Sequence, residues 1–462
     1  MKTINIRETG IISSEDMLQT KALQSVIDNL EEDTTIIFAG GTYLLSTIFL
    51  RSDLHFVFED GCVILGSPAF RDYAGEERVD YPLYQDGSHS YFNPSLFVGK
   101  NLRNVSFEGP VKIDMQDSWD FENVRNMYHR GAKCFAFREC SGLTFRDLEI
   151  YNATDLAVYI AGCSDIIIKN IKMRVYIDGI SPDNCKNVLI EDCDVDSGDD
   201  GIVFKSSFTL NRPGECNGIE VRNCTVKSRC NAVKFGSESI GGFRNITLSN
   251  LKLRETRLAG IALESVDGAI IDNICFRDIT MENVNAPIFV HLGKRLRGPE
   301  GSKIGAIRNI TLENIRAGGP YVPYNCVPWN YASYENNDTL QYPWILDNPG
   351  ASGIVCDAGA AQKGPWQFVS NICGLEGFPL ENIRLKNIDI ELSGGCSDYN
   401  REVPEEGSVY PEVYAYGKVL PAKGIYFRHI TGLSLDNVKV RTINKDLRDG
   451  FVFDDVADLS IS

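Results

Sequence analysis

Leu143-Thr-Phe-Arg-Asp-Leu148 is followed 23 residues later by Ile166-Ile-Ile-Lys-Asn-Ile171, and 22 residues further on by Val188-Leu-Ile-Glu-Asp-Cys193. In each stretch apolar residues recur with a period of two, which is typical of a β-strand with one buried face. An Asn or Asp then stands one position before the last apolar residue. This repeated phrase decides the fold, because it sets the length of the unit that the chain uses again and again.

The same phrase, whole or in part, occurs ten times. The other seven copies begin at Val105, Ile219, Ile246, Ile274, Ile310, Ile383 and Leu433. Units this short cannot close a core alone, so successive units must stack on one another. Coils of short strands stacked about 4.8 Å apart form a parallel β-helix. We therefore predict an all-β fold, a single-stranded right-handed parallel β-helix that spans residues 1–462 as one domain; its handedness follows by analogy from the crossover rule.

The N-terminal part of the chain, residues 1–65, is expected to hold a cap and the first coils. Residues 15–30 carry an apolar stripe with helical spacing, and Ser14 precedes them as a possible N-cap. The stripe consists of Leu18, Ala22, Leu23, Val26 and Ile27. We expect this helix to cover the open edge of the first coil.

Longer intervals between copies indicate two loop insertions, at 70–97 and 320–373. The second insertion contains Trp329, Tyr331, Tyr334, Tyr342, Trp344 and Trp366. Two interpretations of these aromatic residues stay open: they stack on sugar rings, or they form a packed lid or a subunit interface.

Small polar residues and cysteines recur at fixed positions of the repeat. We expect each repeated Asn or Asp to occupy the sharp bend between strands and to hydrogen-bond the local backbone. This structural role is favoured over glycosylation even where the sequence reads Asn-x-Ser/Thr, at Asn104, Asn223, Asn245 and Asn309. The chain has 14 cysteines and none forms a Cys-x-x-Cys pair, so buried, reduced thiols are expected. Those that recur, and are expected to stack in the interior, are Cys163, Cys185, Cys193, Cys216 and Cys224.

The composition excludes several classes of protein. With 46 Lys and Arg against 63 Asp and Glu, the formal charge is −17, and 43% of the residues are hydrophobic. These values are not those of a disordered, collagen-like or small disulfide-bonded protein. The acidity argues against a nucleic-acid or membrane partner, and no run approaches the roughly 20 apolar residues of a membrane span. Residues 1–10 carry no secretory signal, so we expect a cytoplasmic protein, while a processed secreted form stays open.

Three aspartates form the candidate catalytic group. Asp178 lies in Tyr176-Ile-Asp-Gly, and Asp199 and Asp200 lie in Gly198-Asp-Asp-Gly201. Asp178 and Asp199 are 21 residues apart, close to one coil, so they should share a column on adjacent coils. The flanking glycines indicate a bulge or turn that lets both neighbouring carboxylates reach one surface.

Crowded carboxylates repel one another, and this repulsion is expected to raise the pKa of at least one of them. A protonated acid would then stand beside a carboxylate base, which is the pair that glycoside hydrolysis requires. An ordinary solvated turn and a calcium site are the alternatives.

The motifs resemble glycoside hydrolase family 28, the polygalacturonase family, and its bacterial members in particular. Tyr176-Ile-Asp178-Gly179 is similar to the family's Asn-Thr-Asp-Gly, and Gly198-Asp199-Asp200 to its Gly-Asp-Asp. Gly236-Ser-Glu238, followed by Gly241-Gly-Phe-Arg-Asn245, matches a bacterial motif. The resemblance covers most of the chain and implies a pectin lyase-like solenoid.

By this resemblance Asp199 would be the general acid that protonates the leaving oxygen. Asp178 and Asp200 would hold and activate the attacking water, which gives inversion at the anomeric carbon. Room for that water implies an acid-to-base separation of about 6.5 to 9.5 Å. The resemblance implies no metal and no organic cofactor.

The chain departs from the family pattern at two places. Arg229-Cys230-Asn231 replaces Gly-His-Gly, and Ala262-Leu263-Glu264 replaces the Arg-Ile-Lys that grips a galacturonate carboxylate. The second change removes charge-assisted hydrogen bonds and adds repulsion, so we expect a neutral sugar, or one that other residues hold. The candidate substrate-binding residues are Lys205, Asn231, Lys234, Glu238, Glu264, His291 and Arg295. For the cations the alternative is a solvated surface charge, and for the two glutamates it is a reserve catalytic role.

The sequence therefore predicts an inverting glycoside hydrolase with an oligosaccharide or polysaccharide substrate, pectin-derived or related to plant or microbial saccharides. The long loops indicate a pocket that accepts chain ends, and so exo action. A β-helix lyase or epimerase is one alternative, but it needs a cation and a base beside a carboxylate. A carbohydrate-binding protein without turnover is the other, and the missing histidine favours it. The sequence indicates neither the exact sugar and linkage nor the oligomeric state.

Overall fold

The structure is a computed structural model. It describes residues 2–31, 33–77, 79–85, 87–120, 131–319, 368–396, 399, 402–406, 411–417 and 419–462, together with the backbone of two short strands at 331–332 and 339–340. The contacts divide the chain into two compact units. Unit 1 comprises Met1–Ser197 and Ser207–Cys224, and unit 2 comprises Gly198–Ser206 and Thr225–Ser462.

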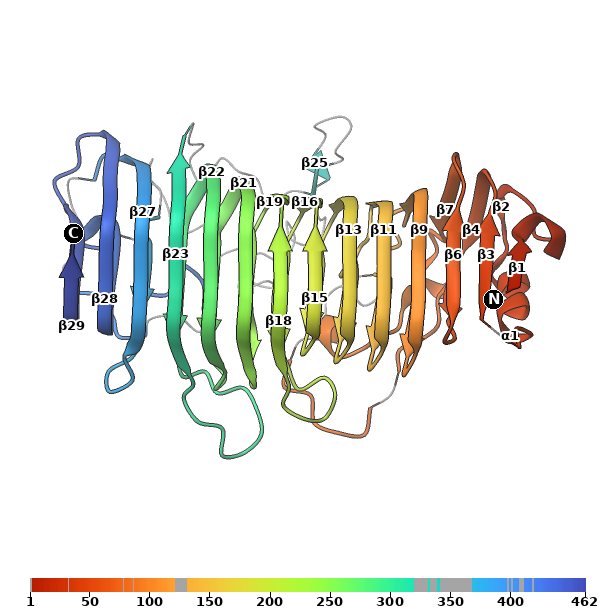
Figure 1. The fold of residues 1–462 in the computed structure, drawn as a ribbon, viewed down its shortest axis with the longest axis horizontal. Coiled ribbons are helices and arrows are strands. Elements are labelled where there is room, and N and C mark those ends of the chain that lie inside the picture. The colour runs from red at the N-terminus through yellow and green to blue at the C-terminus, as the bar shows by residue number, and fades with distance from the viewer. Residues whose placement is uncertain are drawn as a thin grey trace. The chain divides into compact units, whose positions relative to one another are not determined.

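Unit 1 consists of parallel strands with one α-helix near its start. Its strands are β1 (Lys2–Asn5), β2 (Ser14–Leu18), β3 (Thr34–Phe38), β4 (Gly41–Leu45), β5 (Ile48–Phe49), β6 (Leu54–Phe58), β7 (Cys62–Gly66), β8 (Ser95–Lys100), β9 (Arg103–Asp114), β10 (Lys133–Arg138), β11 (Ser141–Tyr151), β12 (Val158–Ala161), β13 (Ser164–Val175), β14 (Ile180–Asp183), β15 (Lys186–Glu191), β16 (Asp194–Ser197) and β18 (Glu215–Arg222). Its helices are α1 (Thr20–Asp28) and the short 3-10 helices η1 (Ile6–Thr9), η2 (Phe70–Asp72) and η3 (Gly87–His89). Figure 1 shows β3, β6, β9, β11, β13 and β15 side by side.

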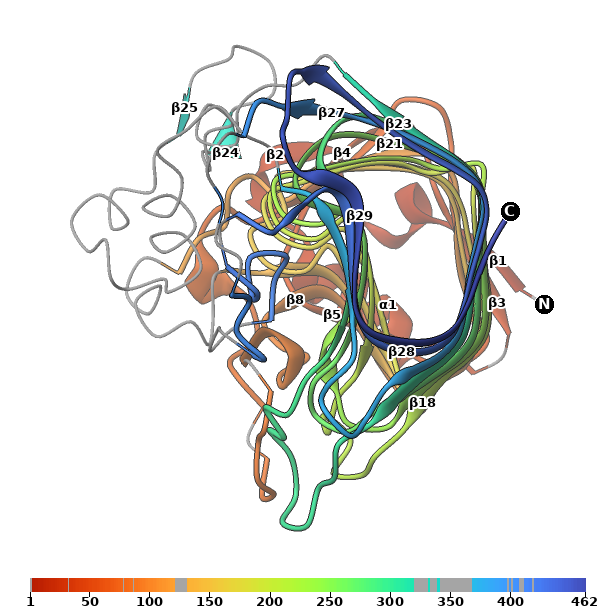
Figure 2. The ribbon, with the colours of Figure 1, turned by 90° about the vertical axis from the view of Figure 1, so that its left-hand side faces the viewer.

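Unit 2 repeats this arrangement with longer strands. They are β17 (Ile202–Ser206), β19 (Thr225–Ser228), β20 (Val233–Ser239), β21 (Gly242–Ser265), β22 (Ile270–Leu292), β23 (Ala306–Gly318), β24 (Tyr331–Ala332), β25 (Thr339–Leu340), β26 (Ser370–Cys373), β27 (Leu380–Gly394), β28 (Ala422–Asn444) and β29 (Asp449–Ile461). The longest strands follow the outline of a coil round its corners, as Figure 2 shows for β28. Each unit is thus a stack of parallel coils, which is the predicted β-helix architecture.

The repeated phrase pairs residue for residue between successive coils. In unit 1, Leu143 pairs with Ile166 and Ile166 with Val188. In unit 2 the first residues of five copies form one column, namely Ile246, Ile274, Ile310, Ile383 and Leu433. The expectation that the units stack in register is confirmed within each unit.

The Asn and Asp of the phrase stand at corners, as expected, but several of their side chains form hydrogen bonds to one another between coils. Their φ angles lie between 51° and 59°, in the left-handed region that Asn and Asp tolerate best among residues with a side chain, at Asp147, Asn170, Asp192, Asn223, Asn250, Asp278, Asn314, Asn387 and Asn437. Asn387 Nδ2 donates to Asn314 Oδ1 at 3.0 Å, and Asn437 Nδ2 donates to Asn387 Oδ1 at 3.0 Å. The expected bond to the local backbone is therefore replaced here by a ladder of amides between coils.

Buried side chains stack in the same register. In unit 1 the rings of Phe56 and Phe107 are 4.8 Å apart, and those of Phe107 and Phe145 are 5.8 Å apart and nearly parallel. The 12 cysteines that the structure describes carry free thiols, and all but Cys275 are buried. Cys140 N donates to Cys163 Sγ at 3.2 Å, so these cysteines belong to the interior stack, as expected.

The predicted helix over 15–30 is too long. Residues Ser14–Leu18 form β2 instead, and Leu18 pairs with Leu44 of β4. Gln19 N then donates to Leu44 O at 2.8 Å, and α1 begins only at Thr20. Pairing with the next coil therefore prevails over the helical pattern in this stretch. The apolar stripe holds for the remainder, since Leu23 and Ile27 are buried.

The two predicted insertions have different outcomes. The chain between β7 and β8 contains η2 and η3, and β8 already begins at Ser95. Most of 320–373 lies outside the described residues, and so do the side chains of the six aromatic residues named above. Its last four residues form β26, which pairs with β22 and β28 as part of a coil.

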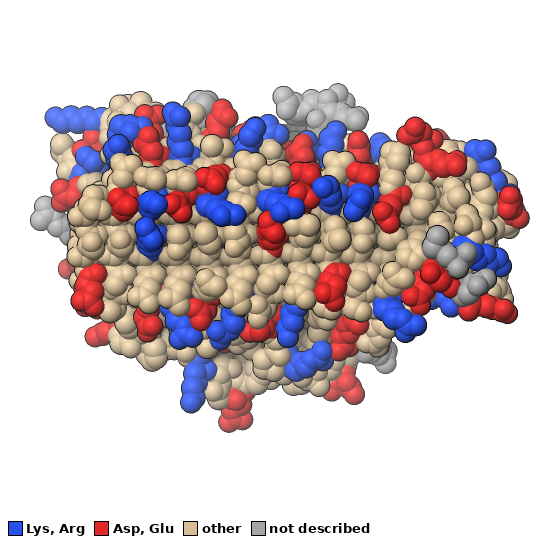
Figure 3. Space-filling view, viewed as in Figure 1, with Lys and Arg blue, Asp and Glu red and all other residues tan. Residues whose placement is uncertain are grey.

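Charged side chains of both signs intermingle on the face of unit 2 that carries β21, β22 and β23 (Figure 3). Asp272 of β22, for example, lies 3.2 Å from Arg244 of β21 and 3.0 Å from Arg308 of β23. Among the described residues there is no helix whose length and apolar character suit a bilayer crossing.

We expect Asn387→Ala to lower the free energy of unfolding by about 2 kcal/mol. Alanine in the left-handed region costs about 1–2 kcal/mol, and the ladder loses two amide hydrogen bonds. Asn387→Gly loses the same bonds but adopts the left-handed conformation without strain, so it should be less destabilised. Urea unfolding of the three proteins measures the difference. A glycine variant less stable than the alanine variant would contradict the role of the corner conformation.

Candidate active site

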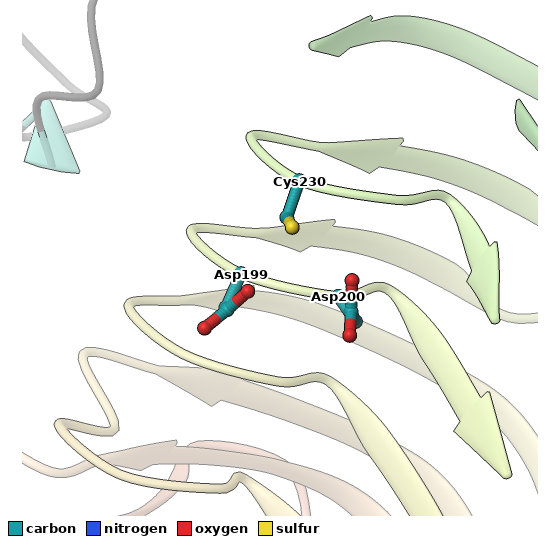
Figure 4. Close-up of side chains that lie close together, drawn as sticks. All are labelled: Asp199, Asp200 and Cys230. Atoms are coloured by element: carbon teal, nitrogen blue, oxygen red, sulfur yellow. The ribbon is translucent and has the colours of Figure 1, made fainter. Parts of the chain in front are cut away.

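The Gly-Asp-Asp-Gly segment forms a bend between the end of β16 and the start of β17. A side chain at position 201 would meet Ala232 O at 2.6 Å, so only glycine allows the next coil to approach here. Gly201 N donates to Asn231 O at 2.9 Å, and Ser228 Oγ donates to Asp199 O at 2.6 Å. The bend is therefore fixed to the coil that contains Cys230, as Figure 4 shows.

The two aspartates of this bend differ in exposure. Asp199 is half-buried, whereas Asp200 is only 4% exposed. The expectation that both carboxylates reach the surface is therefore wrong for Asp200, and so is the alternative of an ordinary solvated turn. One carboxylate oxygen of each lies within 4.8 Å of the other, closer than the interval expected between acid and base.

Asn231 joins Asp200 to the next coils. Its backbone N and its Nδ2 both donate to Asp200 Oδ1, at 3.1 and 2.9 Å, and its Oδ1 accepts from Ala259 N at 3.0 Å. Burial would raise the pKa of Asp200, but Lys234, Lys205 and the bonds from Asn231 outweigh this effect and lower it. The upward shift predicted for at least one of the three aspartates does not occur at Asp200, which stays ionised because its neighbours are cations and donors.

Lys234 on β20 is the centre of a buried charge cluster. Its Nζ lies 3.6 Å from Asp200 Oδ2, 3.5 Å from Glu264 Oε1 and 2.5 Å from Glu412 Oε1. Its side chain is only 2% exposed, so the alternative of a solvated surface charge is wrong for this lysine. One ammonium group therefore contacts three carboxyl groups.

Glu412 is a site residue that the sequence did not indicate. It is 1% exposed and accepts hydrogen bonds from Lys234 Nζ and from Asn231 Nδ2. Its position belongs to no copy of the repeat, and its two partners precede it by 181 and 178 residues. Burial raises its pKa, although Lys234 opposes that shift. No local signal marks this glutamate, because its role arises only from a distant contact.

The two glutamates predicted to bind substrate have contrasting surroundings. Glu238 accepts from Lys205 Nζ at 2.8 Å and from Arg297 Nη2 at 2.6 Å. Glu264 is fully buried, and neither of its oxygens accepts a hydrogen bond within the described part of the chain. Burial raises the pKa of Glu264 well above its ordinary value, with Lys234 opposing. A methyl group on Gly236 would lie 2.8 Å from Glu264 O, too close for an ordinary contact, which accounts for the glycine of the Gly-Ser-Glu motif.

His291 lies on β22 in register with Glu264 of β21, and Arg295 follows the end of β22. Burial and the nearby Arg295 lower the pKa of His291 to about 3, so its ring is neutral, and its Nδ1 lies 2.6 Å from the Tyr416 hydroxyl. Arg295 grips Asp267 with two bonds, from Nε at 2.8 Å and from Nη2 at 2.5 Å. The sequence missed Tyr416 and Asp267, which fix these two predicted residues.

Asp178 belongs to unit 1, where it is 4% exposed and lies 4.0 Å from His89 Nε2. Its place in a column with Asp199 stays a prediction, as do the substrate contacts of Lys205, Asn231, Lys234, Glu238, Glu264, His291 and Arg295.

A metal ion fits this site poorly. Asp199, Asp200 and Cys230 each offer one possible ligand atom within 4.8 Å of the others. Burial raises the pKa of the Cys230 thiol well above its ordinary value, and calcium prefers oxygen ligands to sulfur. Lys234 also holds its positive charge next to Asp200. The donor set therefore does not suit the calcium alternative.

Comparison with known proteins finds polygalacturonases both among the sequence relatives and among the structural neighbours. A probable polygalacturonase of Vitis vinifera is 24% identical over 297 residues, which cover 60% of this chain and 60% of that relative. An exopolygalacturonase of Thermotoga maritima has a TM-score of 0.62 and 18% identity, over 84% of this chain and 87% of that one. A family 28 exopolygalacturonase of Yersinia enterocolitica also has a TM-score of 0.62, with 15% identity, over 98% of this chain and 78% of that one.

These structural similarities confirm the predicted right-handed parallel β-helix. The sequence pattern described as Glycosyl hydrolases family 28 matches residues 81–319. Because this match covers more than half of the chain, the protein belongs to glycosyl hydrolase family 28.

Proposed function

We propose that the protein hydrolyses glycosidic bonds of pectin-derived saccharides with inversion at the anomeric carbon. The observation that carries the proposal is the pair of adjacent carboxylates on one bend of unit 2, Asp199 half-buried and Asp200 buried. Hydrolysis needs one carboxyl group that donates a proton to the leaving oxygen and one carboxylate that activates water. Because the two carboxylates approach within 4.8 Å, inversion is supported by the family motif and not by their separation.

The surroundings of the two aspartates support a division of roles. Asp200 is kept ionised by Lys234 and Asn231, which suits a base that takes a proton from water. Asp199 is the more exposed of the two and suits the acid that meets the leaving oxygen. The third role, that of Asp178 in holding the water, rests on the family motif.

Elimination by a lyase or epimerase has less support. That chemistry needs a cation beside the substrate carboxylate, and the cation next to Asp200 is already in contact with three carboxyl groups. The family membership and the names of the relatives, which are polygalacturonases, support pectin as the source of the substrate. Exo action is supported by the structural neighbours named exopolygalacturonases.

We expect Asp199→Asn to lower kcat about 10²- to 10⁴-fold while saccharide binding persists, because the amide cannot donate the acid's proton. Products from a panel of pectin-derived oligosaccharides and neutral aryl glycosides, identified by mass, report the reaction. Saturated products confirm hydrolysis, unsaturated products indicate a lyase, and unchanged saccharides indicate a binding protein. Asp278→Asn makes the same chemical change at a corner where other coils carry Asn and should leave kcat unchanged. Near wild-type activity in Asp199→Asn would remove the acid assignment.

We expect Cys230→Ala to lower kcat/KM less than about fivefold, since a protonated, buried thiol offers neither a nucleophile nor a base. Steady-state kinetics on the best substrate of the panel, with a melting temperature as the check on folding, measures the effect. Complete loss of activity in a folded variant would show that the thiol takes part in the reaction.

Lys234→Met should move the acidic limb of the pH profile to higher pH. Without this cation the ionised form of Asp200 is less stable, so the pKa of Asp200 rises by about one unit. The base therefore becomes protonated at a higher pH. The measurement is kcat/KM between about pH 3 and 7. Lys294→Met replaces an exposed lysine and should leave the limb in place. An unshifted limb in Lys234→Met would mean that another group is the base.

A further inference from the structure

The segment that carries Glu412, residues 411–417, is called the strap here. It is fixed to unit 2 at three points along its length. Glu412 bonds Lys234 and Asn231, Val413 O accepts from Asn371 Nδ2 at 3.3 Å, and the Tyr416 hydroxyl lies 2.6 Å from His291 Nδ1. The ring centroids of Tyr416 and His291 are also 5.3 Å apart, in an edge-to-face contact. These contacts hold the Glu412 carboxylate in place on the ammonium group of Lys234.

Three other cations of this region are also in ion pairs. Lys205 and Arg297 both contact Glu238, at 2.8 and 2.6 Å. Arg295 forms two bonds with the carboxylate of Asp267. Within the described part of unit 2, each of these side chains already has an anionic partner that belongs to the protein.

The charges around Asp200 consequently favour an uncharged ligand. Lys234 brings one positive charge, and the carboxylates of Asp200 and Glu412 lie within 4.0 Å of it. Glu264 adds a third carboxyl group, whose pKa burial raises well above its ordinary value. A sugar carboxylate that approached Asp200 would meet the like charges of Asp200 and Glu412. Uronic acids are usually held by Arg or Lys through charge-assisted hydrogen bonds, and here the candidate lysine is taken. Sugar hydroxyls, in contrast, donate readily to carboxylates.

We infer that Glu412 is a specificity-determining residue: by occupying Lys234 it makes the sugar site at Asp199 and Asp200 prefer an uncharged sugar over a uronic acid. The inference rests on the proposed function for the location of the site. It adds the class of sugar and assigns the selection to a residue of the strap.

Binding to matched saccharides tests this inference separately from turnover. Oligogalacturonides and the same oligosaccharides after chemical reduction of each carboxylate to a primary alcohol differ only at C6. Isothermal titration with the Asp199→Asn protein should show at least about tenfold tighter binding of the reduced form. Adding Glu412→Gln keeps an amide oxygen that can accept from Lys234 but removes the negative charge. We expect this change to reduce the preference at least about threefold.

Glu313→Gln provides the matched control. Glu313 forms a similar pair with Lys386, at 2.8 Å, but on the partly exposed surface of β23 and β27. The control should leave the binding ratio of the two saccharides unchanged. If the Glu412→Gln protein does not fold, the salt dependence of the Asp199→Asn protein serves instead. Added NaCl should strengthen binding of the charged saccharide, because it screens repulsion, and leave the reduced saccharide unaffected.

Several outcomes would overturn the inference: tighter or equal binding of the charged saccharide, binding of neither saccharide, an unchanged ratio in folded Glu412→Gln protein, or weakening of the charged complex by salt. Failure of the proposed function is distinguishable from these outcomes. Wild-type protein that binds the reduced saccharide preferentially and cleaves neither saccharide would overturn hydrolysis and leave the selection of uncharged sugars intact.

Discussion

Parallel, in-register pairing of successive coils is the constraint on which the rest of the structure depends. Because each residue lies directly above its counterpart, one position of the repeat generates a whole column. Inward positions form the apolar column from Ile246 to Leu433, and corner positions form the amide ladder of Asn314, Asn387 and Asn437. The same rule places Asp200 beside Asn231, and Asn231 beside Ala259. The core, the corners and the bend that carries Asp199 and Asp200 are therefore products of one register.

The candidate active site uses this register but interrupts its regularity. Most buried positions in the described part of the chain carry an apolar residue, whereas here Asp200, Lys234 and Glu264 are all buried on neighbouring coils. Buried charges are tolerated only when they are paired or hydrogen-bonded, and the ammonium group of Lys234 provides that pairing. Glu264 has the ion pair with Lys234, but its oxygens accept no hydrogen bond among the described residues, and burial raises its pKa. Local departures from a stable pattern of this kind are typical of functional sites.

Much of this organisation could be predicted from the sequence. The spacing of the phrase beginning at Leu143 was sufficient to predict the strands, their stacking and the corner positions, because the interval between copies gives the length of one coil. The glycines around Asp199 and Asp200 predicted the bend that carries them, since Gly201 permits the close approach of the next coil, but they did not predict the burial of Asp200. The predicted helix was too long because residues 14–18 fit both a helical and a strand pattern. Only the pairing of Leu18 with Leu44 on the next coil decides between the two. The downward pKa shift of Asp200 depends on Lys234 and Asn231, whose proximity no local pattern reveals.

The strap has a consequence for how the protein is made. Glu412 follows its partner Lys234 by 178 residues, and a ribosome adds about 5–20 residues per second, so the lysine is synthesised on the order of ten seconds or more before its counter-ion. The intervening coils can stack during that time, with Lys234 facing Asp200 and Glu264 alone. The electrostatic surroundings of the Asp199–Asp200 bend are thus completed only after the strap has been translated, and a nascent chain halted before the strap would carry the aspartate pair in a different electrostatic field.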